Sequence, residues 1–301
     1  MAPLDCQTLM AIGSSSQKGK YMSGTKIPQE KIADFKRDGV VLLKNAFSKD
    51  WLDILRTNID EAHARPSPHL VRHTKDPDAP AYYEDFWSWS MFDGFENFVR
   101  NSPCSEYAAQ LLDAERINLV MDNWFMREAG SKSRPPFHQD LAYFDFTGTM
   151  CVLWLPLEPV TRENGISFVR GSHLWDKLFM RVRFTDGHKA GSDGVTVVNG
   201  ERYELPPDVN ANSEEYDLIT YEMDLGDAIY FDMRTLHGGL SDVIPTQTVR
   251  RYTLRMTKED GMIKYRGDWA KGEREIFEAA GYKEGDTLTG DFFPQLWSKS
   301  S

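Results

Sequence analysis

The first third of the chain has apolar residues recurring every three or four positions, as amphipathic helices do. Residues 28–39, PQEKIADFKRDG, follow this spacing and end on Gly39, which predicts one helix. Residues 48–64 repeat the pattern after a serine cap and predict a second helix. The run 40–47 between them is short and β-rich. The aromatic stretch 84–113 predicts two further helices.

From about residue 116 the pattern changes to short runs of β-branched and aromatic residues separated by Gly, Pro and Asn. Such runs are typical of strands in an all-β barrel or jelly roll. They occupy residues 116–130, 150–160, 166–173, 222–233 and 250–259. The polar stretch 181–221 predicts a long insertion, which in a compact domain often serves as a lid or binding loop. A short helix and an aromatic end follow at the C-terminus.

The composition favours one globular domain. The chain has 301 residues, of which 41% are hydrophobic, enough to build a sizeable core. We expect a single domain over residues 28–301. Residues 1–27, rich in Ser, Gly and Lys, predict a flexible N-terminal arm.

Charge and cysteine content narrow the classes of partner. The net charge is −11 and no basic stripe offsets it, which argues against nucleic acid. No apolar run approaches the ~18 residues of a membrane span, so we expect no membrane partner. The three cysteines lie far apart, and no secretory signal is evident, which favours a reducing, cytoplasmic setting. The sequence leaves the oligomeric state open.

The clearest chemistry lies in PPFHQDLAYFDF, residues 135–146, where His138 and Asp140 are one residue apart. On an extended strand such side chains point the same way, so both can reach one point inside a barrel. Two histidines and one carboxylate occupy one face of an octahedral iron and leave three positions open. His237, which precedes two glycines, is the best third ligand. Taken alone, His-x-Asp also fits a hydrogen-bonded polar pair at a strand end.

A second polar element, VRRYTLR, follows His237. Arg251, Thr253 and Arg255 would share one face of this strand, and Arg250 would point the other way. An arginine next to a hydroxyl can hold a carboxylate through charge-assisted hydrogen bonds. The strand therefore predicts a site for a carboxylate-bearing ligand.

Five stretches carry a resemblance to a known family: FKRDGVVLLKNAFS, PFHQD, VLWLPLEPVTRENGISFVRGSHLW, DLGDAIYFDMRTLHGG and RRYTLR. Over about residues 28–260 the chain resembles the phytanoyl-CoA dioxygenase-like (PhyH) family of Fe(II)/2-oxoglutarate-dependent oxygenases. The Trp-x-Pro-Leu, Glu-Asn-Gly and Gly-Ser-His elements, in this order, are more specific than the His-x-Asp pair. The resemblance implies a mainly β fold with flanking helices: a double-stranded β-helix (jelly roll, cupin-like) buttressed by the N-terminal helices.

The resemblance also implies roles for particular residues. It makes His138, Asp140 and His237 the Fe(II) ligands. Trp154 matches a tryptophan that lines the cosubstrate pocket in relatives; the alternative is a core aromatic. Arg127 matches a position where relatives place a lysine or another polar residue near the cosubstrate; the alternative is a salt bridge at the barrel rim.

The anchor for 2-oxoglutarate departs from the family pattern. Where relatives hold the anchoring arginine, this chain has Thr248, and the segment SDVIPTQT looks like a small insertion. The anchor therefore moves to Arg250 or Arg251. We favour Arg251, because it would share a strand face with Thr253 and Arg255.

The implied activity is oxidation of a small, largely apolar metabolite at a C–H bond, most simply hydroxylation. Such enzymes use O2 and convert 2-oxoglutarate to succinate and CO2. Halogenating relatives have a small residue in place of Asp140, so its presence favours hydroxylation or a related oxidation. Tyr143, Phe144 and Phe146 are the predicted substrate wall, since apolar ligands favour aromatic-lined pockets.

Two alternatives stay open at this point. The first is a non-catalytic small-molecule-binding protein on the same fold. The second is a cupin-type metalloenzyme that does not use 2-oxoglutarate, although such enzymes use more histidines and no His-x-His occurs here.

Overall fold

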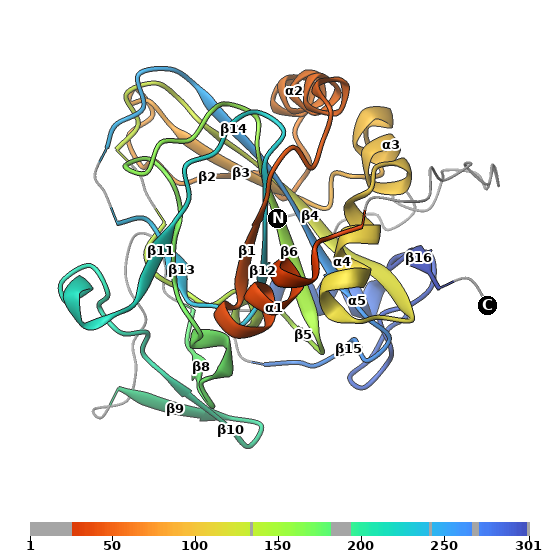
Figure 1. Ribbon diagram of the computed structural model, residues 1–301. Coiled ribbons are helices and arrows are strands. Elements are labelled where there is room, and N and C mark those ends of the chain that lie inside the picture. The colour runs from red at the N-terminus through yellow and green to blue at the C-terminus, as the bar shows by residue number, and fades with distance from the viewer. Residues whose placement is uncertain (1–25, 133–134, 182–193, 241–242, 267–270, 300–301) are drawn as a thin grey trace.

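The computed structural model describes residues 26–132, 135–181, 194–240, 243–266 and 271–299. Their core is a large antiparallel sheet faced by a small one (Figure 1). The large sheet has the order β1 (Val40–Leu43), β12 (Ala228–Asp232), β6 (Met150–Pro156), β14 (Val249–Thr257), β4 (Arg116–Arg127), β3 (Tyr82–Phe86) and β2 (Val71–Arg72), and β16 (Gln295–Ser298) also pairs with β4. The small sheet has the order β11 (Leu218–Thr220), β7 (Ser167–Val169) and β13 (His237–Gly238). This arrangement confirms the mainly β, jelly-roll prediction.

The helices agree with the predicted pattern, with one correction. They are α1 (Gln29–Asp38), α2 (Lys49–Ala64), α3 (Asp93–Asn101), α4 (Cys104–Leu112) and α5 (Lys271–Ala279). Gly39 ends α1 in the left-handed conformation (φ 76°), which glycine adopts without steric cost. The helical prediction for residues 84–113 was wrong at its start, because Tyr82–Phe86 forms β3 and pairs with β4. The aromatic residues of this strand, Tyr82, Tyr83 and Phe86, are half-buried on the sheet.

The stretch 181–221 contains more regular structure than predicted. Val195–Val198 (β9) and Glu201–Glu204 (β10) form a hairpin that pairs with β8 (Leu178–Phe179). Leu218–Thr220 is already a strand of the small sheet. Residues 182–193 lie outside the described residues, and the lid role of this segment stays a prediction.

The large sheet separates two environments, and β14 shows both. Tyr252 and Leu254 belong to the hydrophobic core on the helical side of the sheet, where α2 packs against β14 and α4 against β6 and β4. Figure 1 shows α2, α3 and α4 together on that side. The alternate residues of β14 face the opposite way, toward the small sheet. The N-terminal helices thus buttress one sheet, as the resemblance implied.

The N-terminal boundary differs from the prediction by a residue or two. Ile27 is buried, with 2% of its surface exposed, and packs in the helical-side core. Its backbone N–H donates to Gln110 Oε1 over 2.8 Å. Ile27 therefore belongs to the folded body, and only residues 1–25 of the predicted arm lie outside the described residues.

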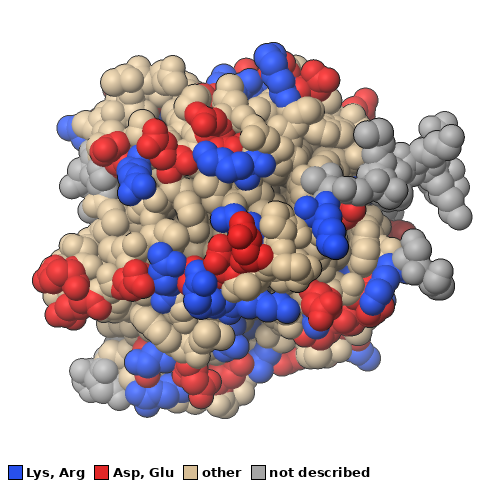
Figure 2. Space-filling view, in the orientation of Figure 1, with Lys and Arg blue, Asp and Glu red and all other residues tan. Residues whose placement is uncertain are grey.

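Charged side chains of both signs alternate over the face shown in Figure 2. Along α2, for example, Lys49 pairs with Asp53 and Arg65 with Glu61, each four residues apart. Within the described ranges, no helix combines the length and the apolar character needed to cross a membrane.

A candidate metal centre

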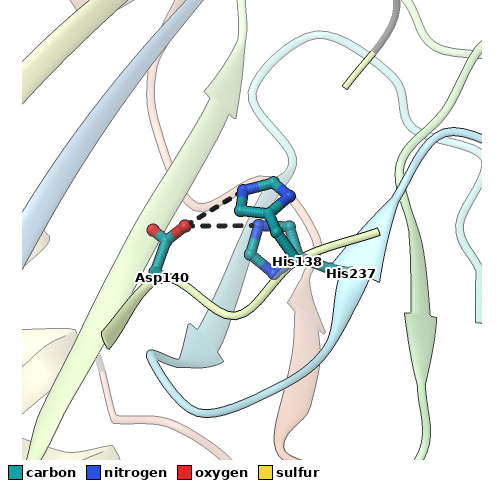
Figure 3. Close-up of side chains that lie close together, drawn as sticks. All are labelled: His138, Asp140 and His237. Carbon is teal, nitrogen blue, oxygen red and sulfur yellow. Dashed lines mark ion pairs between the residues drawn. The ribbon is translucent and has the colours of Figure 1, made fainter. Parts of the chain in front are cut away.

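Three predicted ligands converge in the interior between the two sheets. His138 and His237 form an isolated β-bridge, in which each backbone N–H donates to the other's carbonyl over 2.8 and 2.9 Å. Asp140 stands just after this bridge, at the N-terminus of a short 3-10 turn (Leu141–Tyr143). The three side chains point toward one another in Figure 3.

The two neighbouring ligands converge for a reason that the sequence analysis did not foresee. We expected His138 and Asp140 to share one face of an extended strand. Asp140 instead has helical backbone angles (φ −63°, ψ −41°), so the chain turns immediately after the bridge. This turn, together with the bridge to His237, brings the carboxylate to the histidines.

The distances describe a compact donor set. Asp140 Oδ1 lies 3.2 Å from His138 Nε2 and 3.6 Å from His237 Nε2. One ligand atom from each residue lies within 4.8 Å of the other two. Asp140 and His237 are buried, with 4% and 3% of their surfaces exposed, and His138 is half-buried. Two imidazoles and one carboxylate on one side of a point suit a divalent iron ion.

Backbone carbonyls fix which ring nitrogen of each histidine faces the centre. His138 Nδ1 lies 2.8 Å from the Pro136 carbonyl, and His237 Nδ1 lies 2.9 Å from the Thr235 carbonyl. A carbonyl oxygen can only accept, so each Nδ1 carries the proton and donates. Each Nε2 therefore keeps its lone pair for a metal, an orientation that metal-bound histidines share.

The protonation states suit metal binding. Burial, followed by the proximity of His138, lowers the pKa of His237 to about 3, so its ring is neutral at pH 7. Burial disfavours the Asp140 carboxylate, but the Arg255 guanidinium and the two histidines outweigh this and hold its pKa well below the usual range. The site thus offers the neutral imidazole of His237 and the ionised carboxylate of Asp140.

Arg255 takes a position different from the one predicted. We expected it beside Arg251 at the cosubstrate, but its Nε and Nη2 donate to Asp140 Oδ2 over 3.1 and 2.8 Å. Its Nη1 donates to the amide oxygen of Asn123 on the neighbouring strand β4. In this structure the Arg255 guanidinium is therefore hydrogen-bonded to a candidate metal ligand, Asp140.

Arg251 and Arg250 lie on opposite faces of β14. Arg251 lies with its guanidinium carbon 5.1 Å from the centroid of the Trp154 ring, and burial lowers its pKa to about 10. Its Nη1 donates to the Arg250 carbonyl over 2.7 Å, and Glu158 lies 3.7 Å away. Arg250 reaches across to α2, where it pairs with Asp60 over 2.8 Å, and it also pairs with Glu158.

Thr253 and Arg127 extend the interior face around Arg251. Thr253 lies directly opposite Trp154 in the register of β14 and β6. Arg127, at the end of β4, lies opposite Val249. Its Nη2 donates to the Ser131 carbonyl over 2.8 Å, and burial lowers its pKa. Among the described residues, the buried Nε of Arg127 has no hydrogen-bond partner.

The three predicted substrate residues differ in their access to the site. The half-buried ring of Tyr143 lies 5.2 Å from the His138 ring. Phe144 is buried and lies 4.8 Å from the Arg255 guanidinium. Phe146 has 0% of its surface exposed, and its ring stacks on that of Phe144 with the centroids 5.2 Å apart. Phe146 therefore packs in the core against Phe144.

Sequence reasoning missed the polar residues of β3 and β4 beside the metal ligands. Asn123 Nδ2 donates to Glu84 Oε1 over 3.3 Å, and the other carboxylate oxygen of Glu84 lies 2.9 Å from His73 Nε2. A signal was available, because Asn123 has the same strand parity as Arg127 and so faces the same interior. Glu84 was hidden by the incorrect helical prediction.

Solved structures with the same fold agree with this architecture. The carbocyclase SnoK from nogalamycin biosynthesis, described as alpha ketoglutarate dependent, aligns with a TM-score of 0.69 at 15% identity, covering 93% of this chain and 100% of its own. The epimerase SnoN, solved with Fe3+, alpha ketoglutarate and nogalamycin RO, gives 0.67 at 18% identity, covering 89% and 98%. EvdO2 from Micromonospora carbonacea var. aurantiaca, solved with 2-oxoglutarate, gives 0.53 at 17% identity, covering 81% and 96%.

Sequence comparison gives the family directly. No curated protein matches the chain at the level of sequence. The profile of the phytanoyl-CoA dioxygenase (PhyH) family, however, matches residues 35–243, well over half of the chain and all three candidate ligands. The match ends just before β14, where the sequence departs from the family spacing. With the fold and the ligand set in agreement, the chain belongs to the phytanoyl-CoA dioxygenase (PhyH) family.

Proposed function

We propose that this protein is an Fe(II)- and 2-oxoglutarate-dependent oxygenase that oxidises a small, largely apolar metabolite at a C–H bond. The observation that carries the proposal is the buried convergence of His138, Asp140 and His237 in a chain of the PhyH family. When bound, Fe(II) and 2-oxoglutarate supply the oxidising chemistry: O2 is consumed, 2-oxoglutarate gives succinate and CO2, and the metabolite is oxidised.

The three residues would hold the iron from one side. The Nε2 atoms of His138 and His237 and the Oδ1 atom of Asp140 face a common point. Carbonyl hydrogen bonds prevent either imidazole from turning its lone pair away. Three protein ligands would leave three positions for cosubstrate and O2.

Arg251 is the proposed anchor for the distal carboxylate of 2-oxoglutarate. Its side chain is 11% exposed, and the carboxylate of Glu158, which lies 3.7 Å away, is already paired with Arg250. A ligand carboxylate would gain a charge-assisted, two-point hydrogen bond there. Trp154 flanks the guanidinium, while Thr253 and Arg127 add polar groups on the same face.

Hydroxylation is the outcome that we place first. It requires only that the protein position one C–H bond and exclude water, whereas ring closure requires a second substrate group held close to the same carbon. SnoK is described as a carbocyclase and SnoN as an epimerase, so this fold hosts other outcomes. Tyr143, half-buried beside His138, is the aromatic residue best placed to contact the metabolite.

Succinate formation tests the proposal. The purified chain is loaded anaerobically with Fe(II) and 2-oxoglutarate, mixed with a panel of apolar metabolites and exposed to O2, and succinate is measured. We expect the wild-type chain to form succinate, faster with an accepted metabolite, and the His138→Ala chain to form none above background. Equal succinate from both chains across the panel would overturn the proposal and favour a binding protein.

A further inference from the structure

The two oxygens of Asp140 face different partners. Oδ1 points at the two histidine Nε2 atoms, at 3.2 and 3.6 Å. Oδ2 accepts two hydrogen bonds from Arg255, from Nε at 3.1 Å and from Nη2 at 2.8 Å. We propose that Arg255 is a positioning residue that restricts Asp140 to binding the metal through Oδ1 alone. The inference rests on the proposed function only for its metal site, and it extends that site to a residue outside the ligand set.

Restricting Asp140 to one oxygen has a consequence for coordination. A carboxylate can bind a metal through one or both oxygens, and the second mode would occupy a position that the cosubstrate or O2 requires. Oδ2 accepts hydrogen bonds from the Nε and Nη2 groups of Arg255, so this oxygen faces β14 and Oδ1 faces the histidines. The carboxylate therefore presents one oxygen, and three coordination positions of a bound iron would stay open.

Arg255 is itself held from three directions. It lies on β14 with 5% of its surface exposed, so it cannot swing into solvent. Its Nη1 donates to Asn123, whose amide nitrogen in turn donates to Glu84. The ring of Phe144 covers the guanidinium at 4.8 Å, a favourable cation–π distance. A side chain fixed in this way can fix its partner, which is the physical requirement for a positioning role.

Two effects of Arg255 on metal affinity oppose each other. Its positive charge repels a metal ion, but the charge lies on the far side of Asp140 and is neutralised by that carboxylate. Without it, a buried carboxylate would lose two charge-assisted hydrogen bonds and its fixed orientation. Removing a group that orients a metal ligand typically weakens metal affinity by roughly 10- to 100-fold. We therefore expect the loss of orientation to dominate.

Co(II) binding tests this without any turnover. The dissociation constant of Co(II) is measured by calorimetry for the wild-type, Arg255→Met, Arg255→Lys and Arg250→Met chains, without 2-oxoglutarate. We expect Arg255→Met to weaken Co(II) binding roughly tenfold or more. Arg255→Lys keeps the positive charge but lacks the planar, two-pronged guanidinium. Its Co(II) affinity should therefore lie between those of the wild-type and Arg255→Met chains. Arg250→Met removes a neighbouring arginine that faces Asp60 and should leave the affinity unchanged.

The spectrum of bound Co(II) and a variant that leaves Arg255 in place complete the test. The visible spectrum of bound Co(II) reports its ligands, and we expect it to change in Arg255→Met but not in Arg250→Met. Asn123→Ala removes one support of Arg255, keeps all charges, and should weaken Co(II) binding in the same direction, even if Arg255→Met fails to fold. Unchanged or tighter Co(II) binding in the folded Arg255 and Asn123 variants would overturn the inference. If the Arg255 and Asn123 variants bind Co(II) more weakly while the wild-type chain forms no succinate, the proposed function fails and the positioning role of Arg255 stands.

Discussion

At the scale of single residues, neighbouring side chains of β14 lie in quite different surroundings. Arg250 reaches Asp60 on α2 and Glu158 just past the end of β6, whereas Arg251 lies half-buried over Trp154. Strand alternation was enough to predict this separation from the sequence. It could not predict that Arg255 would pair with Asp140, because that contact depends on a turn elsewhere in the chain.

The arginine anchor gives the first prediction. Arg251→Ala removes a charge-assisted hydrogen bond worth about 1.5–3 kcal/mol, so 2-oxoglutarate should bind roughly 10- to 100-fold more weakly. Arg250→Ala is the matched control and should keep the wild-type affinity, measured by calorimetry with the metal-loaded chain under anaerobic conditions. The reverse result, with affinity lost only in Arg250→Ala, would show that the anchor is misassigned.

A buried carboxyl remote from the metal gives a prediction on pH. Asp122 is completely buried on β4, where Ser88 Oγ and Tyr252 Oη lie 3.1 and 3.2 Å from its Oδ2. Burial raises the pKa of Asp122 from 3.8 to about 7. Folding therefore favours the protonated form. The resulting stabilisation is complete below pH 3.8 and is lost as the pH rises through 7.

Asp122→Asn keeps the shape of this side chain and removes its titration. Relative to this variant, the wild-type free energy of unfolding should decrease between pH 4 and pH 8, by at most about 4 kcal/mol. Urea denaturation of both chains across this range measures the difference. Parallel pH profiles would mean that Asp122 is ionised in the folded protein.

At the scale of elements, the metal site depends on how two short segments approach each other. The bridge between His138 and His237 joins the loop after β4 to β13. The sequence predicted the three ligands through their residue types and the family resemblance. It could not predict the helical turn at Asp140 or the strand at Tyr82–Phe86, because pairing with distant segments determines both conformations.

Gly238 tests the importance of this close approach. A Cβ atom at Gly238 would lie 2.7 Å from the Phe137 backbone, too close for the two segments to keep their spacing. We expect Gly238→Ala to push β13 away from His138 and to weaken Co(II) binding, measured by calorimetry. Gly281→Ala is the control for backbone strain alone: φ there is +87° and a Cβ meets no atom within 4 Å, so the variant should lose some stability but keep the wild-type Co(II) affinity. Wild-type affinity in Gly238→Ala would contradict the proposed importance of the bridge.

At the scale of the whole molecule, one sheet supports two separate cores. The helical-side core contains Leu55, Phe98 and Tyr252, and the interior core contains Val152, Phe168 and Phe231. Hydrophobic periodicity predicted the division into N-terminal helices and later strands. It predicted the N-terminal boundary of the folded body less accurately. The burial of Ile27 depends on Gln110 in α4, which lies far along the chain.

Truncation tests where the folded body begins. That residues 28–301 form a single domain stays a prediction. A chain beginning at Lys26 keeps the buried Ile27 and should match the full chain in thermal unfolding temperature and Co(II) affinity. A chain beginning at Pro28 loses that side chain, whose burial contributes about 1.5–3 kcal/mol, and should unfold at a lower temperature. Equal stability of the two truncated chains would contradict the assignment of Ile27 to the folded body.

The most direct test of the central claim is the visible absorption of the anaerobic protein with Fe(II) and 2-oxoglutarate. A cosubstrate chelating Fe(II) gives a metal-to-ligand charge-transfer band, and the measurement requires no knowledge of the metabolite. We predict this band for the wild-type chain, its loss when 2-oxoglutarate is omitted, and its absence in folded His237→Ala. No band from the folded wild-type chain at saturating Fe(II) and 2-oxoglutarate, or an equal band from His237→Ala, would contradict the account.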